Sequence, residues 1–174
     1  MWTNLIILSL VTLQRLVELF IARRNTKRLL ANGGVDVSAG HYPLIVIFHA
    51  LWLAGLWYFV WGHDVSWPWI FAYLVLQAAR GWIIAALGSR WTTRIIVVPG
   101  ETLSAAGPYK YFRHPNYMIV AAEIFILPMV FGLWWYALLF ASVNLALLYY
   151  RIREEEAALK PLRMENQLPV EPST

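Results

Sequence analysis

Two polar motifs stand out in a chain that is otherwise strongly apolar, and they flank its last long apolar stretch. The first is Arg113-His114-Pro115-Asn116-Tyr117, which closely follows Gly107-Pro108-Tyr109. The second begins at Arg151 and ends with the acidic run 154–156. Imidazole, guanidinium and carboxylate groups supply the hydrogen-bond donors, acceptors and fixed charges that orient a polar ligand. The motifs therefore indicate a small-molecule site at one end of an apolar segment.

The first motif also predicts where a helix begins. Pro115 suits the first turn of a helix, where its missing N–H group costs no hydrogen bond. His114 would then stand at the N-cap or just before it, near free N–H groups that attract an anionic group such as a carboxylate.

Spacing predicts which polar side chains share a helical face. Asn116 and Glu123 are seven residues apart on one expected helix, and Asn144, Arg151 and Glu155 are spaced by seven and four on the next. Such spacings place residues on the same side of a helix. If the two helices form a hairpin, both faces can point inward, away from lipid, where ionisable groups are costly.

The composition indicates that these polar groups belong to a membrane protein. The chain has 174 residues, of which 60% are hydrophobic and only 14% are charged, and its mean hydropathy is +0.54. A soluble domain usually carries about 25% charged residues. This composition argues against an ordinary soluble globule and a disordered chain, and the absence of cysteine excludes a disulfide framework and a thiolate metal site.

We therefore expect an all-α integral membrane protein with five spanning helices and no separate domain. A spanning helix needs about 20 mostly apolar residues. The final apolar stretch, 117–150, is too long for one span, and Pro128 and Gly132 near its middle predict a tight helical hairpin. The expected spans are 5–22, 43–61, 67–87, 116–130 and 133–150, with the last helix extended through the acidic run, a cytoplasmic loop at 88–115 and a loose tail at 161–174.

The basic residues predict the orientation of these spans. Twelve of the 14 Lys and Arg residues follow spans one, three and five, whereas the loops around 62–66 and 131–133 have none. The positive-inside rule then places the N-terminus outside and the C-terminus in the cytoplasm, as in a multi-pass protein of a bacterial inner membrane. This distribution favours membrane orientation over a nucleic-acid partner for a chain with a net charge of +4.

Several polar residues leave both a structural and a functional interpretation open. Arg80 with Gln77 could brace helices or line a substrate pocket. Arg15 and Glu18 have the spacing of a structural ion pair. Three scattered histidines, at positions 41, 49 and 63, show no metal-ligand spacing, so structural roles and no bound metal are expected.

The combination of the two motifs resembles the isoprenylcysteine carboxyl methyltransferase family. The R-H-P-x-Y pattern, a short apolar hairpin and a downstream R-x-x-E-E pattern carry this resemblance, from about Arg90 to Leu159. The first half is similar to small bacterial proteins that O-methylate alkylpyrones and phenolic lipids and are often encoded beside type III polyketide synthases. The segments that carry this second resemblance are 15–18, 41–43 and 91–96.

The resemblance implies a membrane methyltransferase that uses S-adenosylmethionine and releases S-adenosylhomocysteine. It implies cofactor contacts from the backbone of Thr102 and Leu103 and from Tyr109, His114, Asn116, Tyr117 and Glu155. It also places Arg151 near the acceptor's reacting oxygen, as the catalytic residue. Glu101 stands where eukaryotic members often have histidine. We expect Arg80 and Glu123 to contribute to the binding of the acceptor.

The acceptor implied is a lipophilic molecule that enters from the bilayer, while the cofactor enters from the cytoplasm. A prenylcysteine-type carboxylate or an acidic enol would arrive largely ionised, whereas a phenol with a pKa near 10 would need a base, for which Glu123, Glu154 and His114 are candidates. Two other classes stay open: a non-catalytic membrane scaffold or sensor, and a small transporter in which Arg80 and Glu123 line the pathway.

Overall fold

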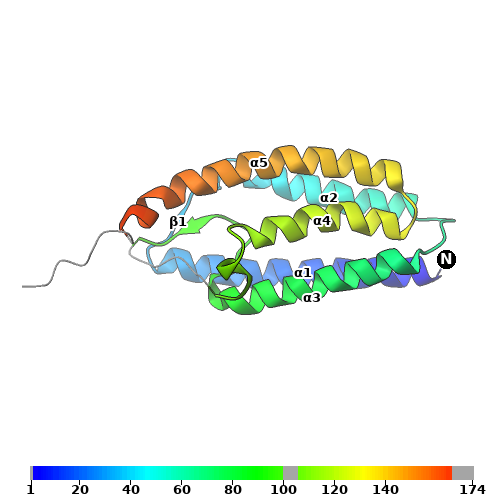
Figure 1. Cartoon of the computed structure of the whole chain (residues 1–174), viewed down its shortest axis with the longest axis horizontal. Helices are drawn as coiled ribbons and strands as arrows, with labels where there is room; N and C mark the ends of the chain where they lie inside the picture. The colour runs from blue at the N-terminus through cyan, green and yellow to red at the C-terminus, as the bar shows by residue number, and fades with distance from the viewer. Residues whose placement is uncertain (1, 100–105, 166–174) are drawn as a thin grey trace, which may run out of the picture.

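The computed structural model describes residues 2–99 and 106–165, with side chains described up to residue 160. Five long helices form an elongated bundle in this part of the chain (Figure 1). Their bounds are α1 Trp2–Ala31, α2 Tyr42–Phe59, α3 Trp67–Leu87, α4 Pro115–Val130 and α5 Trp134–Glu165. Two 3₁₀ turns, η1 Gly88–Arg90 and η2 Gly107–Lys110, and two short strands, β1 Val35–Asp36 and β2 Ile96–Val97, complete the described elements.

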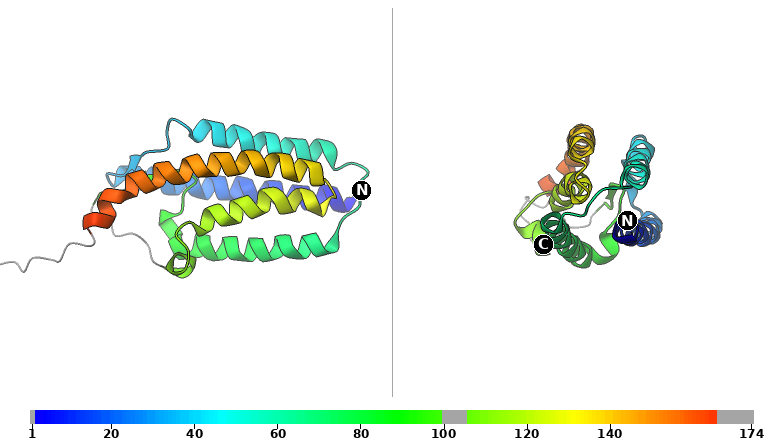
Figure 2. Two further views of the ribbon diagram at one scale, coloured as in Figure 1. Left: turned by 45° about the horizontal axis from the view of Figure 1, so that its top comes forward. Right: turned by 90° about the vertical axis from the view of Figure 1, so that its right-hand side faces the viewer.

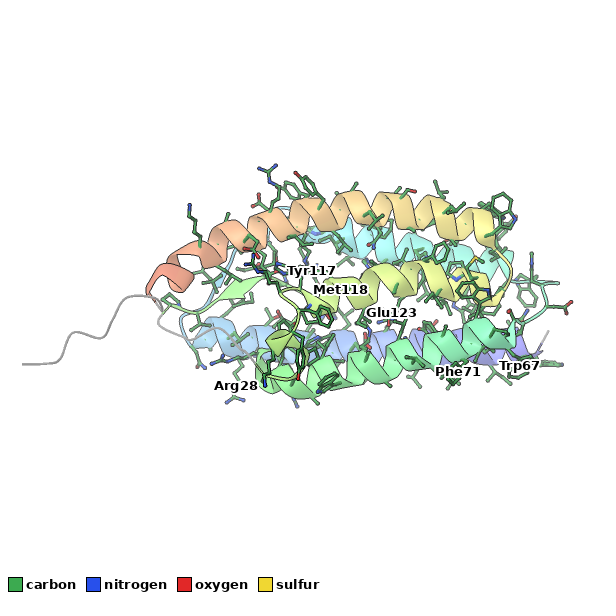
Figure 3. All side chains as sticks on the ribbon, viewed as in Figure 1. Arg28, Trp67, Phe71, Tyr117, Met118 and Glu123 are labelled. Carbon is green, nitrogen blue, oxygen red and sulfur yellow. The ribbon has the colours of Figure 1, made fainter. Side chains whose placement is uncertain are left out.

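The helices run along a common axis and give the bundle two distinct ends. Viewed along that axis they follow one another in the order α2, α1, α3, α4, α5 (Figure 2). One end carries the C-terminus of α1, the α3–α4 segment and the last turns of α5, and we call it the basic end because the clusters of Lys and Arg lie there. Figure 3 shows Arg28 at this end.

Membrane-spanning capacity is clear for four of the helices. α1, α2, α3 and α5 are long and apolar enough to cross a bilayer. Helix α4 has 16 residues, which at about 1.5 Å each reach about 24 Å, less than the roughly 30 Å of a hydrocarbon core. α4 packs between α3 and α5, so it lies within a membrane bundle, and the count of five crossings stays a prediction.

Proline and glycine set the boundaries that position the site. Pro115 is the first residue of α4 and His114 its N-cap, as expected. At the other end of α4 the chain turns through Gly132, whose φ of +69° is a left-handed conformation that glycine adopts without strain. The segment 131–133 then leads directly into α5, which packs along α4.

Apolar side chains face both inward and outward, as a membrane bundle requires. The largest buried cluster joins Leu8 of α1, Leu56 of α2, Ile124 and Leu127 of α4 and Tyr136 of α5. On the outside, Trp67 and Phe71 of α3 are each 70% exposed, on the outer surface of the bundle (Figure 3). Large apolar groups on an outer surface mark contact with lipid or with another protein.

The basic end holds more structure than an all-α fold with plain loops. Helix α1 continues to Ala31 because the residues after its predicted end at 22 include no Gly or Pro before Gly33. Strand β1 then pairs antiparallel with β2, and Asp36 bonds Arg94 at 2.5 Å. This pairing ties the α1–α2 connection to the segment 88–115, which was expected to be a loop.

Helix α5 also extends further than expected. It runs to Glu165, so residues 161–165 of the predicted loose tail are helical. Glu, Ala, Leu and Lys, which favour helix, fill positions 154–160 and carry the helix past the membrane-facing part. The remaining tail, 166–174, lies outside the described residues.

Candidate functional site

Gly107 directs the chain into the site at the basic end. Its φ is +56°, and a Cβ atom at this position would lie 2.7 Å from the Cβ of Ala86. Only glycine meets both conditions without strain. Tyr109 follows in η2 and packs beside Ile83 and Trp91. Burial, reinforced by the charge of Glu155, raises the pKa of Tyr109 well above its usual range, so its hydroxyl stays a hydrogen-bond donor.

His114 joins the start of α4 to the acidic run of α5. Its Nε2 lies 2.7 Å from Oε1 of Glu156 and its Nδ1 lies 3.5 Å from Oε2 of Glu155. Contact with Glu155 raises the pKa of His114 above its ordinary value, with burial opposing this effect and Glu156 adding to it. The imidazole ring also stacks on Tyr117, with ring centroids 5.6 Å apart.

Arg151 is buried where α4, α5 and the segment before β2 meet. Its Nε donates to the hydroxyl of Tyr117 at 3.0 Å, and an Nη donates to the carbonyl of Thr93 at 2.5 Å. The guanidinium carbon lies 5.2 Å from the centroid of the Tyr117 ring. Two hydrogen bonds and one ring contact therefore fix the direction of the guanidinium group.

A pocket at the basic end, the polar pocket, contains most of these groups. It encloses about 130 Å³, and Tyr109, His114, Asn116, Tyr117, Arg151 and Glu155 are among its lining residues. Oε2 of Glu155 is buried without a hydrogen-bond partner among the described residues. Nδ1 of His114 lies 3.5 Å from this oxygen, at the limit of a hydrogen bond, so the oxygen can still accept one from a ligand that brings its own donors.

A second and larger cavity, the apolar cavity, lies deeper in the bundle. It encloses about 310 Å³, and its apolar walls include Leu16 and Leu19 of α1, Val46 of α2, Val120 of α4 and Leu148 of α5. Its wall and that of the polar pocket have residues in common: Trp91, Thr92, Asn116, Tyr117 and Arg151. The two spaces therefore adjoin at the guanidinium of Arg151.

Charged residues from three helices meet at the wall of the apolar cavity. Glu123 of α4 is 2% exposed and pairs with Arg80 of α3, whose Nε lies 2.8 Å from Oε1. Gln77 donates to the same oxygen at 2.8 Å, and Arg15 of α1 lies 3.0 Å from the other oxygen. Arg15 also pairs with Glu18 at 2.7 Å. The prediction that Glu123 faces the bundle interior beside Arg80 is confirmed (Figure 3).

The sequence model of the isoprenylcysteine carboxyl methyltransferase (ICMT) family matches residues 69–161, which span the whole polar pocket from α3 to α5. The chain belongs to this family. ICMT membership and the four apolar helices make it a multi-pass membrane protein of a methyltransferase family.

Two relatives of this ICMT member are uncharacterized proteins. It is 34% identical to the uncharacterized protein YpbQ of Bacillus subtilis (strain 168) over 160 residues, which cover 89% of this chain and 95% of that protein. It is 26% identical to an uncharacterized protein of Haemophilus influenzae over 154 residues, covering 85% of this chain and 90% of the relative. No solved structure matches the chain.

The residues predicted for an ICMT site are brought together in two groups. The polar pocket is lined by six of them, Tyr109, His114, Asn116, Tyr117, Arg151 and Glu155. Arg80 and Glu123 instead line the apolar cavity, together with Asn116, Tyr117, Asn144 and Arg151. The inward direction expected for the two polar helix faces is therefore confirmed. Thr102, Leu103 and Glu101 lie outside the described residues.

Sequence reasoning missed residues that reach both spaces from elsewhere in this ICMT fold. Trp91 and Thr92 line both walls, and His49 lines the apolar cavity. The segment 91–96 was singled out for its likeness to bacterial proteins, and His49 was assigned a structural role because it shows no metal-ligand spacing to the other histidines. In the described part of the chain, no cluster of His, Asp and Glu is arranged to hold a metal ion.

Proposed function

We propose that this protein is an S-adenosylmethionine-dependent O-methyltransferase that acts on a lipophilic acceptor at the cytoplasmic face of a bacterial inner membrane. The observation that carries the proposal is the common wall of the two spaces, where Asn116, Tyr117 and Arg151 line both the polar pocket and the apolar cavity. A methyl group can pass directly from a polar donor to a lipophilic acceptor only if the reacting atoms of the two molecules are in contact.

The polar pocket has the chemistry that the amino-acid end of the cofactor needs. Oε2 of Glu155, which accepts no hydrogen bond from the described residues, suits an ammonium group or a hydroxyl donor. His114 at the N-cap of α4 and the backbone N–H group of Asn116 suit a carboxylate, since the N–H groups of Tyr117 and Met118 already donate to the carbonyl of His114. The described walls enclose about 130 Å³, less than the roughly 300 Å³ or more of sites that enclose a whole drug-sized ligand, so they account for one part of the cofactor.

The chain's own residues would then orient the reacting oxygen. The bound cofactor supplies the activated methyl group. Arg151 is fixed by Tyr117 and by the carbonyl of Thr93, and its constant positive charge holds an acceptor oxygen, whether carboxylate or enolate, at the common wall. The apolar walls exclude water, which strengthens this electrostatic contact.

Acceptor entry from the bilayer is supported by the outer wall of the apolar cavity. Leu16 of α1 and Val46 of α2 both line this cavity and are 59% and 42% exposed. An acyl or prenyl chain could pass between these helices, while the cofactor reaches the basic end from water. The positive-inside rule assigns that end to the cytoplasm. Alkylpyrones, phenolic lipids and prenylcysteine-type carboxylates are the acceptor classes that we propose.

A methyl-transfer assay tests this function. The detergent-purified protein is incubated with methyl-labelled S-adenosylmethionine and, separately, with an alkylpyrone, 3-pentadecylphenol, a prenylcysteine and palmitate. We expect label in the organic extract with at least one acceptor and none in a Tyr117→Phe, Arg151→Gln double variant. A scaffold or a transporter would transfer no label to any of the four.

A further inference from the structure

His49 of α2 is a titratable group in the apolar cavity that has no role in the methyl transfer proposed for Arg151 and Glu155. Its Nδ1 lies 2.8 Å from the carbonyl oxygen of Ile45, one turn earlier in the same helix. A carbonyl oxygen only accepts, so Nδ1 must carry the proton of the neutral ring. Nε2 then has a free lone pair. This contact with Ile45 is the one hydrogen bond of His49 in the described part of the chain, and the residue lines the cavity.

The charges around the cavity favour the neutral form of this ring. Arg15 of α1, Arg80 of α3 and Arg151 of α5 line the same wall, as do Glu18 of α1 and Glu123 of α4. Both carboxylates are already paired with arginines. Two further titratable groups, the phenols of Tyr42 and Tyr117, also line it. A positive imidazolium among three guanidinium groups and apolar side chains is unfavourable, so the ring is neutral before the reaction, as a general base must be, and would readily release a proton that it had accepted.

The three groups that the sequence offered as bases are less suited to this task. Glu123 receives hydrogen bonds from Gln77 and Arg80 and pairs with Arg15, which makes it a weak proton acceptor. His114 faces Glu155 and Glu156 in the polar pocket, away from the apolar cavity. Glu154 lines neither space in the described part of the chain.

We propose that His49 is the general base of this enzyme and that its acceptor carries a neutral phenolic hydroxyl group in place of a carboxylate. This inference rests on the proposed methyltransferase function. The hydroxyl proton moves to Nε2 of His49 while the oxygen forms its bond to the methyl carbon. The bond between that carbon and sulfur breaks, its electron pair stays on sulfur, and the imidazolium later releases the proton to water.

A second group in the cavity fits a ring acceptor with more than one oxygen. Asn144 of α5 is 1% exposed and lines the cavity, and its Nδ2 has no hydrogen-bond partner among the described residues. A buried amide donor without a partner is unfavourable unless a ligand supplies an acceptor. The second hydroxyl of a dihydroxyphenol would supply one, whereas a simple fatty acid would not after Arg151 has engaged its carboxylate.

The test compares acceptors that differ in acidity. His49→Asn can retain the hydrogen bond to the Ile45 carbonyl while it removes the basic nitrogen, and His63→Asn in the exposed α2–α3 connection is the matched control. The acceptors are 3-pentadecylphenol, which is neutral at pH 7, and a dinitro-substituted alkylphenol, which is ionised at this pH. Binding of S-adenosylhomocysteine is measured for each protein, so that loss of the cofactor site is separated from loss of the base.

We expect His49→Asn to lower turnover of the neutral phenol about 100-fold or more, to change turnover of the ionised phenol by less than about threefold, and to leave S-adenosylhomocysteine affinity unchanged. The loss on the neutral phenol should shrink as the pH approaches about 10, where the phenol ionises by itself. Equal losses on both phenols, or wild-type transfer to palmitate and to neither phenol, would overturn the role of His49 while leaving the methyltransferase intact. Failure to bind S-adenosylhomocysteine would instead overturn the proposed function.

Nitrogen NMR of ¹⁵N-histidine-labelled protein gives a readout that needs no acceptor. The His49 signals are assigned by their disappearance in His49→Asn. At neutral pH we expect a protonated Nδ1 and a bare Nε2. An imidazolium at pH 7, or the opposite tautomer, would contradict the proposal.

Discussion

At the scale of single residues, Arg151 and Glu155 show how one helical turn can divide two tasks. Arg151 is held by Tyr117 and Thr93 at the common wall of the two spaces. Glu155 lines the polar pocket alone, with a buried oxygen that accepts no hydrogen bond from the described residues. Because Arg151 and Glu155 are four residues apart in the sequence, both were predicted to lie on one face of the helix. Their different surroundings come from α4 and from the β2 segment, which no spacing within α5 reveals.

Arg151→Lys is expected to lower methyl transfer about 100-fold, with S-adenosylhomocysteine affinity changed by only a few-fold. Lysine keeps the charge but cannot bond Tyr117 and Thr93 together in one plane, so the acceptor oxygen loses its orientation. Arg153→Lys, at an exposed position two residues away, should leave both quantities unchanged. Near-normal turnover in Arg151→Lys would remove this residue from the mechanism.

His114 is expected to make the stability of the protein depend on pH. Its pKa in the folded state is raised, so its stabilising contribution is full below the ordinary value of about 6.5 and is lost as the pH rises through the folded-state value. The melting temperature of the detergent-solubilised protein should therefore fall as the pH rises above about 6.5. In His114→Gln this fall should be smaller, and an identical pH profile in both proteins would count against the ion pairs with Glu155 and Glu156.

At the scale of elements, packing between helices depends on positions that the sequence pattern left unmarked. A Cβ atom at Gly55 of α2 would collide with the hydroxyl group of Tyr136 in α5. That hydroxyl donates to the carbonyl of Trp52 at 2.8 Å. The glycine therefore brings α5 onto α2 at the end opposite the site, while the cavity between them stays open near His49.

Gly55→Ala should destabilise the bundle by about 1–3 kcal/mol because the added methyl group displaces the Tyr136 ring and its hydrogen bond. Alanine favours helix by about 1 kcal/mol over glycine, so propensity alone predicts the opposite sign. Gly81→Ala in α3 is the matched control, since a Cβ there meets nothing within 4 Å. Denaturant titrations in detergent measure both variants, and an unchanged or raised stability in Gly55→Ala would refute this close contact.

The sequence predicted those features that depend on a local pattern, and it did not predict those positions that are set by packing between distant segments. The apolar run of α3, the start of α4 at Pro115 and the turn at Gly132 were predicted because each depends on a few adjacent residues. The pairing of Val35–Asp36 with Ile96–Val97 joins segments about 60 residues apart in the sequence. The position of His49 likewise depends on how α2 packs against α1, α4 and α5. Such arrangements have no local signature.

At the scale of the whole molecule, the distribution of charged and apolar residues suits a reaction between a lipid in the bilayer and a cofactor in water. The apolar cavity lies among the membrane helices, and the polar pocket lies at the basic end, where the Lys and Arg clusters gather. A lipid acceptor and a water-soluble cofactor can then approach from different sides. This account requires that the basic end faces the cytoplasm.

Single introduced cysteines can test that orientation. The chain has no cysteine of its own, so a thiol reagent can modify only the introduced one. Asp64→Cys lies in the α2–α3 connection and Ala39→Cys in the α1–α2 connection, and both positions are exposed. Ser38, one residue earlier, is fully buried and would label poorly. In sealed, right-side-out vesicles we expect an impermeant thiol reagent to modify the Asp64→Cys protein and not the Ala39→Cys protein. Modification of both variants from the same side would refute the topology.

The central claim, that the polar pocket binds the methyl donor, is tested most directly by calorimetric titration of the detergent-purified protein with S-adenosylhomocysteine. The account predicts one site in the wild type and an affinity about tenfold to a hundredfold lower in Glu155→Gln. That range follows from the roughly 1.5–3 kcal/mol of a charge-assisted hydrogen bond. Glu154→Gln, which lines neither space in the described part of the chain, should bind like the wild type. Absence of binding in the wild type, or equal affinity in Glu155→Gln, would contradict the account.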